Sequence, residues 1–143
     1  MHALAHQTDV PSPDADVDRA RLGFLRVASA RSRCAARSDL FEACAALSSD
    51  PTRAADALAL ALFRGLSGQG GLPKLRIYQP SARDVSFDEL WLLAALDAAS
   101  RRDTDSLTFL LTRRIPRHGQ RNVGFLIQSL ARALNTGRLR HVA

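Results

Sequence analysis

The sequence predicts an all-α fold, a single-domain bundle of five or six helices, from its composition, its length and its helix-capping patterns. Of the 143 residues, 46% are apolar, and alanine and leucine far outnumber isoleucine, valine, threonine and tyrosine. Alanine and leucine lose little rotamer freedom in a helix, so this composition favours helices over strands. A chain of this length is long enough for one core and too short for two ordinary domains.

Changes in composition along the chain predict three regions. Aspartates and prolines are concentrated in residues 1–17, which we expect to form a disordered acidic tail because they cannot bury enough apolar area. The helical domain then spans residues 18–136, interrupted by a glycine-rich connection (65–73) and an extended segment (74–80). Residues 137–143 follow as a basic C-terminal tail.

Capping signals place the helices that precede the glycine-rich connection. Asp50 directly before Pro51 is the strongest of them, because it puts a side-chain acceptor at the N-cap and a proline at the first helical position. Asp39 and Glu42 resemble a capping box one helix earlier. The expected helices in this half of the chain span residues 17–36, 39–47 and 51–64.

The second half of the chain contains three further expected helices. Ser86 and Glu89 form a capping-box pattern, and the run Leu90–Leu96 that follows is apolar on all sides, so we expect this helix, with Trp91, to be the buried centre. Pro116 separates the last two helices. The expected helices span residues 87–101, 104–113 and 120–134.

Each expected helix carries one phenylalanine. Phe125 lies on the opposite side of its helix from the apolar stripe, among arginine, glutamine and serine, so we expect it to be exposed unless another element covers it. The other five are expected to anchor the core: Phe24, Phe41, Phe63, Phe87 and Phe109.

The formal charge of +6 is unevenly distributed. Residues 106–143 hold seven arginines and no carboxylate. A surface of one sign concentrates phosphates, acidic proteins or anionic lipid head groups near it. The excess of arginine over the single Lys74 is also typical of GC-rich bacterial genomes, so only the placement of the arginines carries the argument.

This placement predicts a small non-enzymatic regulatory protein that binds nucleic acid, with DNA favoured over RNA. Four arginines of the first helix share one face, which fits either a phosphate-binding ridge or an ordinary solvated surface. The last two helices resemble a helix-turn-helix, in which Gln120, Arg121 and Asn122 would lie nearest the bases. Their connection (115–119) is longer than that motif prefers, so a plain helical hairpin is the alternative. The expected contact residues are Arg19, Arg26, Arg33, Arg37, Arg113, Arg114, Arg117, Gln120, Arg121, Asn122 and Arg132.

A second hypothesis is a protein-interaction module, such as an adaptor, antagonist or assembly factor. Its contact patch would be Phe125 and Gln128, flanked by Arg121 and Arg132, because interface centres favour aromatic residues and arginine. An acidic protein would then be the partner in place of nucleic acid.

The remaining patterns indicate no catalytic chemistry. Cys34 and Cys44 are ten residues apart and the histidines are scattered, so we expect no metal site and no cofactor. No acid, base and nucleophile converge in the pattern, so we expect no enzyme. The longest apolar run has seven residues, which predicts no membrane association, and the absence of a secretory signal predicts a cytoplasmic protein. The sequence leaves the oligomeric state open.

Overall fold

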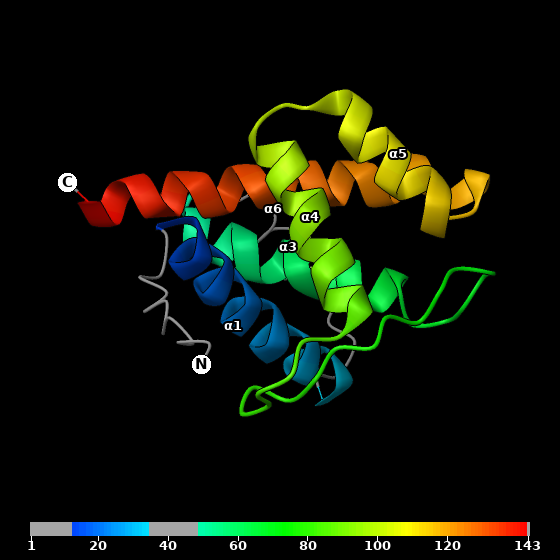
Figure 1. Cartoon of the computed structure of the whole chain (residues 1–143), viewed down its shortest axis with the longest axis horizontal. Helices are drawn as coiled ribbons and strands as arrows, with labels where there is room; N and C mark the ends of the chain where they lie inside the picture. The colour runs from blue at the N-terminus through cyan, green and yellow to red at the C-terminus, as the bar shows by residue number, and fades with distance from the viewer. Residues whose placement is uncertain (1–12, 35–48, 143) are drawn as a thin grey trace, which may run out of the picture.

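Helices make up the fold in the computed structural model of the chain, which describes residues 13–34 and 49–142, with side chains at 15–33 and 49–137. Within these ranges there is no β-strand, only an isolated bridge between Ser67 and Lys74. The all-α fold and the helical bundle are therefore confirmed. The helices are α1 (Pro13–Cys34), α3 (Pro51–Gly65), α4 (Phe87–Ser100), α5 (Thr104–Arg114) and α6 (Arg117–Val142) (Figure 1).

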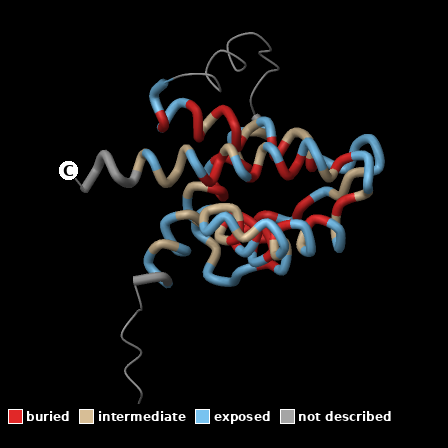
Figure 2. Tube along the Cα trace, turned by 90° about the horizontal axis from the view of Figure 1, so that it is seen from above, coloured by how far each residue is buried: buried red, intermediate tan, exposed pale blue. Residues whose placement is uncertain are grey.

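The long helix α6 organises the bundle. It packs against α3, α4 and α5, while α1 packs against α3 and α4. Figure 1 shows α6 running along the length of the molecule, with α4 crossing in front of it. Figure 2 shows the buried segments facing one another between the helices, with the exposed segments outside. The large side chains that are fully buried come from four helices: Leu25, Leu62, Leu92, Leu96, Ile127 and Leu130.

The two expected helix caps that lie within the described residues are present. The carboxylate of Asp50 accepts a hydrogen bond from the backbone N–H of Thr52 at 3.0 Å. Ser86 and Glu89 form a reciprocal capping box at the start of α4. These caps satisfy backbone donors that the first helical turn leaves unpaired, which is why the starts of α3 and α4 lie where the sequence predicts.

The first and last helices are longer than expected. Helix α1 begins at Pro13, inside the expected acidic tail, because proline suits the first helical position and the nearby aspartates complement the helix dipole. Helix α6 continues to Val142, through the expected basic tail. A Cβ added to Gly137 would lie 3.9 Å from the Pro51 side chain, so packing against the start of α3 supports the helix beyond this glycine.

The expected core anchors are partly wrong. Phe63 is buried and Phe24 is partly buried against the core, but Phe87 is 72% exposed and Phe109 is 57% exposed. Helix α4 is not buried on all sides either, since Leu90 faces outward. Apolar residues at every position of a helix do not reveal which face the neighbouring helices cover, so pattern alone misassigned these residues. Trp91 is buried as expected, and its indole N–H donates to the Leu110 carbonyl at 3.0 Å.

Some expectations fall outside the described residues. These are residues 1–12 of the expected acidic tail, the expected second helix at 39–47 with its capping pair Asp39 and Glu42, and Arg37, Phe41 and Cys44.

Candidate nucleic-acid interface

A short turn joins α5 to α6. Ile115 is buried and extended, with φ −106° and ψ 127°, as a residue before proline prefers. Its N–H caps α5 by donating to the Leu111 carbonyl, and the Gly119 N–H donates to the Pro116 carbonyl at the start of α6. The connection is thus shorter than the expected 115–119, because α6 begins at Arg117. It places the end of α5 beside the start of α6.

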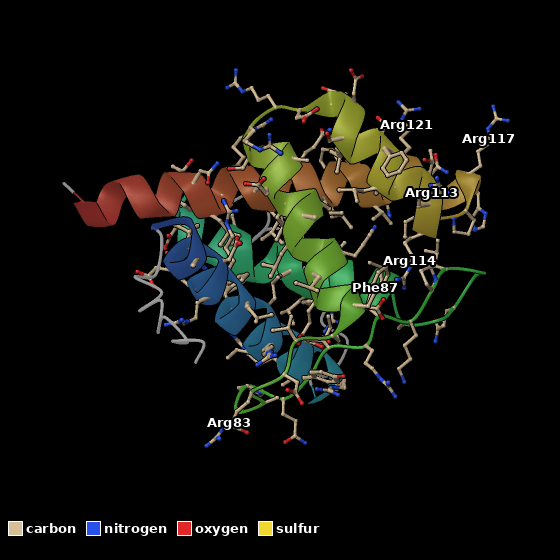
Figure 3. All side chains as sticks on the ribbon, in the orientation of Figure 1. Arg83, Phe87, Arg113, Arg114, Arg117 and Arg121 are labelled. Carbon is tan, nitrogen blue, oxygen red and sulfur yellow. The ribbon has the colours of Figure 1, made fainter. Side chains whose placement is uncertain are left out.

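Four arginines gather at this end of the molecule, which we call the basic end: Arg113, Arg114, Arg117 and Arg121 (Figure 3). The first two lie in the last turn of α5 and the other two in the first turns of α6. Arg113, Arg117 and Arg121 are exposed, and Arg114 is half-buried. Four residues that the sequence predicted as contacts are therefore brought together at one surface.

Arg114 has a structural role within the basic end. Its guanidinium donates to the Asp88 carboxylate at 2.6 Å, and the same carboxylate accepts the Arg76 backbone N–H. The guanidinium also lies over the rings of Phe87, 5.5 Å from the centroid, and Trp91, at 5.9 Å. Arg114 therefore fixes the end of α5 to the start of α4, and Asp88 offsets its charge.

The other three arginines of the basic end have no such compensation within the part of the chain that the structure describes. Among the described side chains, no carboxylate forms an ion pair with Arg113, Arg117 or Arg121. Arg117 and Arg121 are four residues apart on α6, where like charges repel, and the first turn of this helix contains no acidic residue. Cations at a helix N-terminus also oppose the helix dipole. This arrangement is unfavourable for folding and favourable for binding an anion.

The glycine-rich connection covers part of the start of α6. The His118 Nε2–H donates to the Gly70 carbonyl at 2.8 Å. Gly119 lies so close to Leu72 that a Cβ at this position would overlap its methyl group. Gly70 has a positive φ of 63°, which glycine adopts without strain. The connection therefore packs against the first turn of α6.

Two of the residues predicted to contact bases, Arg121 and Asn122, are exposed. The third, Gln120, forms a hydrogen bond within the protein. The Gln120 side-chain amide donates to the Ile115 carbonyl at 2.9 Å and is partly buried. Gln120 therefore caps the end of α5, and its amide would have to leave the Ile115 carbonyl before it could pair with a base. Its position in the tight turn explains this, since the amide lies within reach of an otherwise unpaired helix-end carbonyl.

The arginine ridge expected on α1 does not exist as a continuous surface. Arg19 and Arg33 are exposed, and Arg19 lies 4.0 Å from the Asp16 carboxylate. Arg26, expected on the same solvated face, is only 4% exposed and pairs with Glu89 at 2.9 Å. The segment that precedes α4 covers this part of α1, and helical periodicity cannot anticipate an irregular segment.

The patch expected around Phe125 is accessible. Phe125 is 63% exposed, which confirms the predicted exposure of this ring, and Gln128 and Arg132 are exposed on the same helix. Phe109, which was expected to anchor the core, is instead a surface residue, and its ring centroid lies 5.1 Å from the Arg113 guanidinium. The spacing of four residues between them on a helix is the signal that could have indicated this contact.

Comparisons with models of protein families, with curated proteins and with solved structures found no match, so the functional argument depends on the surface itself. Among the described residues, no three histidine, cysteine, aspartate or glutamate side chains are grouped to hold a metal ion. No described helix is both long and apolar enough to cross a bilayer.

Proposed function

We propose that this protein is a non-enzymatic nucleic-acid-binding protein whose contact surface is the basic end. The observation that carries the proposal is the group of three exposed arginines, Arg113, Arg117 and Arg121, without a carboxylate partner among the described residues. Guanidinium groups match the geometry of phosphate, and each can donate two parallel hydrogen bonds to it. Asn122 and Arg132 extend the polar surface along α6.

We propose that the protein regulates transcription through this binding. A small protein without a catalytic centre acts on nucleic acid by occupying it. The arginines supply affinity through phosphate contacts, and such contacts carry no sequence information. Sequence preference would come from Arg121 and Asn122, whose side chains can pair with base edges.

Replacing Arg117 and Arg121 by alanine tests the proposal. We expect the double variant to bind a labelled oligonucleotide more weakly at every salt concentration. The slope of log affinity against log salt should fall by about one unit for each lost phosphate contact, because fewer counterions are released. The measurement is a fluorescence anisotropy titration over a series of salt concentrations.

The matched control removes two exposed arginines elsewhere, Arg53 in α3 and Arg83 in the segment before α4. Net charge then falls equally, but the basic end stays intact. We expect this control to retain most of the affinity and the full salt slope. Equal losses in the two double variants would show that net charge alone matters and would overturn the assignment of the basic end.

The exposure of Phe125 favours a second candidate function, docking of an acidic protein partner. An aromatic ring that is 63% exposed beside Arg121, Gln128 and Arg132 fits the composition of interface centres. Phe125→Ala distinguishes the two candidates. It should abolish binding to a purified protein partner if Phe125 is the anchor, and leave affinity for duplex DNA nearly unchanged if the arginines bind nucleic acid. A drop in duplex affinity as large as that of the arginine variant would contradict this division.

A further inference from the structure

We propose that the nucleic acid bound at the basic end is single-stranded, with bases stacking on Phe109 and Phe87. This inference rests on the proposed function, and it names the form of nucleic acid. Proteins that bind single strands combine a positive surface for the phosphates with exposed aromatic rings for the bases. Duplex binding gains less from exposed aromatic rings, because the faces of paired bases are already stacked and mainly their edges are presented in the grooves.

Phe109 has the geometry of a stacking platform. Its ring is 57% exposed, and the Arg113 guanidinium lies over it at 5.1 Å from the centroid. The guanidinium is attracted to the face of the ring, and a base can stack on the same ring. The three groups can therefore stabilise one another. The ring also borders a groove of about 500 Å³ between α4 and α5, which is lined by Ala94, Ala98 and Leu110.

Phe87 provides a second exposed ring, beside Arg114 of the basic end. It begins α4, is 72% exposed, and lies against the guanidinium of Arg114, which follows Arg113 in α5. Phe87 and Ala94 are seven residues apart on α4, which corresponds to about 10 Å along the helix. A flexible strand spans such a distance with one or two nucleotides, so one strand can place a base at Phe87 and another at the groove that Ala94 and Phe109 line.

The charges that line the groove indicate the path that the nucleic-acid strand follows over the surface. Asp97 and Asp105 line it on the side away from the basic end, and Arg101 pairs with Asp97 at 2.9 Å. Phosphates are repelled from carboxylates, so the strand leaves Phe109 toward Arg113 and the start of α6. The aromatic rings and the arginines that have no carboxylate partner among the described residues would then form one surface for a single strand.

The start of α6 is poorly suited to the alternative of entering the major groove of a duplex. A recognition helix presents its N-terminal residues to the base edges. Here the glycine-rich connection packs against that turn through His118 and Leu72, and Gln120 is bound to the Ile115 carbonyl. A rigid duplex would meet these loop residues, whereas a single strand can follow the open side of α5.

The test compares an oligothymidylate with a hairpin duplex that has the same number of phosphates, at one salt concentration, by anisotropy. We expect the single strand to bind about tenfold more tightly. Phe109→Leu combined with Phe87→Leu keeps apolar side chains but removes the rings. It should weaken single-strand binding by about 5- to 150-fold for each stacked base that is lost, and leave the duplex affinity unchanged. Phe109→Tyr with Phe87→Tyr keeps the rings and should restore binding.

Three results would count against the inference or the proposal beneath it. A duplex that binds as tightly as the single strand would overturn the preference, while nucleic-acid binding itself would stand. Equal single-strand affinity in the leucine variant would show that the rings do not stack on bases. If neither oligonucleotide binds, the proposed function fails, and the inference fails with it. Circular dichroism of each variant shows whether the fold is intact, and both rings are exposed enough for it to survive.

Discussion

Glu89→Ala should lower the free energy of unfolding by about 3–5 kcal/mol, because it leaves the buried guanidinium of Arg26 without its counter-ion. Glu89 is fully buried. Its two oxygens accept hydrogen bonds from the Arg26 side chain and from the backbone N–H groups of Tyr78 and Ser86. Urea denaturation monitored by the emission of Trp91 measures the change.

Arg26 also forms hydrogen bonds with the segment that precedes α4. Its terminal nitrogens donate to the carbonyls of Ala82 at 2.7 Å and Asp84 at 2.6 Å. The ion pair therefore joins α1, the segment before α4 and α4 itself. This network fixes the loop that covers α1, which is why a residue predicted to bind phosphate has a structural role.

A double variant distinguishes the contribution of the charge pairing from that of the hydrogen bonds to the loop. Replacing Arg26 by Met and Glu89 by Leu removes both charges at similar volume, and buried pairs exchanged in this way are often close to neutral. We expect the double variant to be more stable than Glu89→Ala. A double variant as unstable as the single one would show that the hydrogen bonds to the loop, and not charge pairing, dominate.

The pair also predicts a dependence of stability on pH. Burial raises the pKa of Glu89, but the hydrogen bonds from Arg26, Ser86 and Tyr78 outweigh it and lower the pKa below its ordinary value of 4.5. The folded state thus binds this proton more weakly than the unfolded state does. The contribution of Glu89 is fully present above pH 4.5 and is lost as the pH falls through the lowered pKa. The stability difference between wild type and the charge-free double variant should shift in favour of the variant as acid is added.

Leu92→Ala is expected to be the other strongly destabilising substitution, by about 2–5 kcal/mol, because the cavity adds to the lost transfer free energy. Leu92 is 0% exposed in the core. The matched control is Leu90→Ala, two residues earlier on the same helix, where the side chain is 55% exposed. We expect the control to change stability by less than about 1 kcal/mol. Similar losses at the two positions would contradict the orientation of α4, and thermal unfolding of both variants checks it.

Much of the architecture could be predicted from local chemistry. Asp50, Pro51 and the pair Ser86 and Glu89 set the starts of two helices, since a cap needs only residues adjacent in sequence. The exposure of Phe125 also followed from periodicity. These features depend on a few neighbouring residues, so the sequence contains the information directly.

Features that depend on contacts between residues far apart in the sequence could not be predicted from local patterns. Arg26 looks like a surface arginine until the segment before α4 is folded over it, and Phe109 looks like a core residue until the position of α5 is known. Gln120 caps a carbonyl that only the tight turn brings near. The sequence predicted a cluster of arginines on the last two helices, but which of them lie side by side depends on how α5 and α6 meet.

The affinity of the wild-type protein for labelled nucleic acid at physiological salt is the most direct test of the proposed function. Any basic surface binds weakly at low salt, so only the higher salt concentration is decisive. We expect a sub-micromolar dissociation constant that persists there and that depends on Arg117 and Arg121. Binding that disappears for both single-stranded and duplex oligonucleotides would contradict the proposal and direct attention to a protein partner at Phe125.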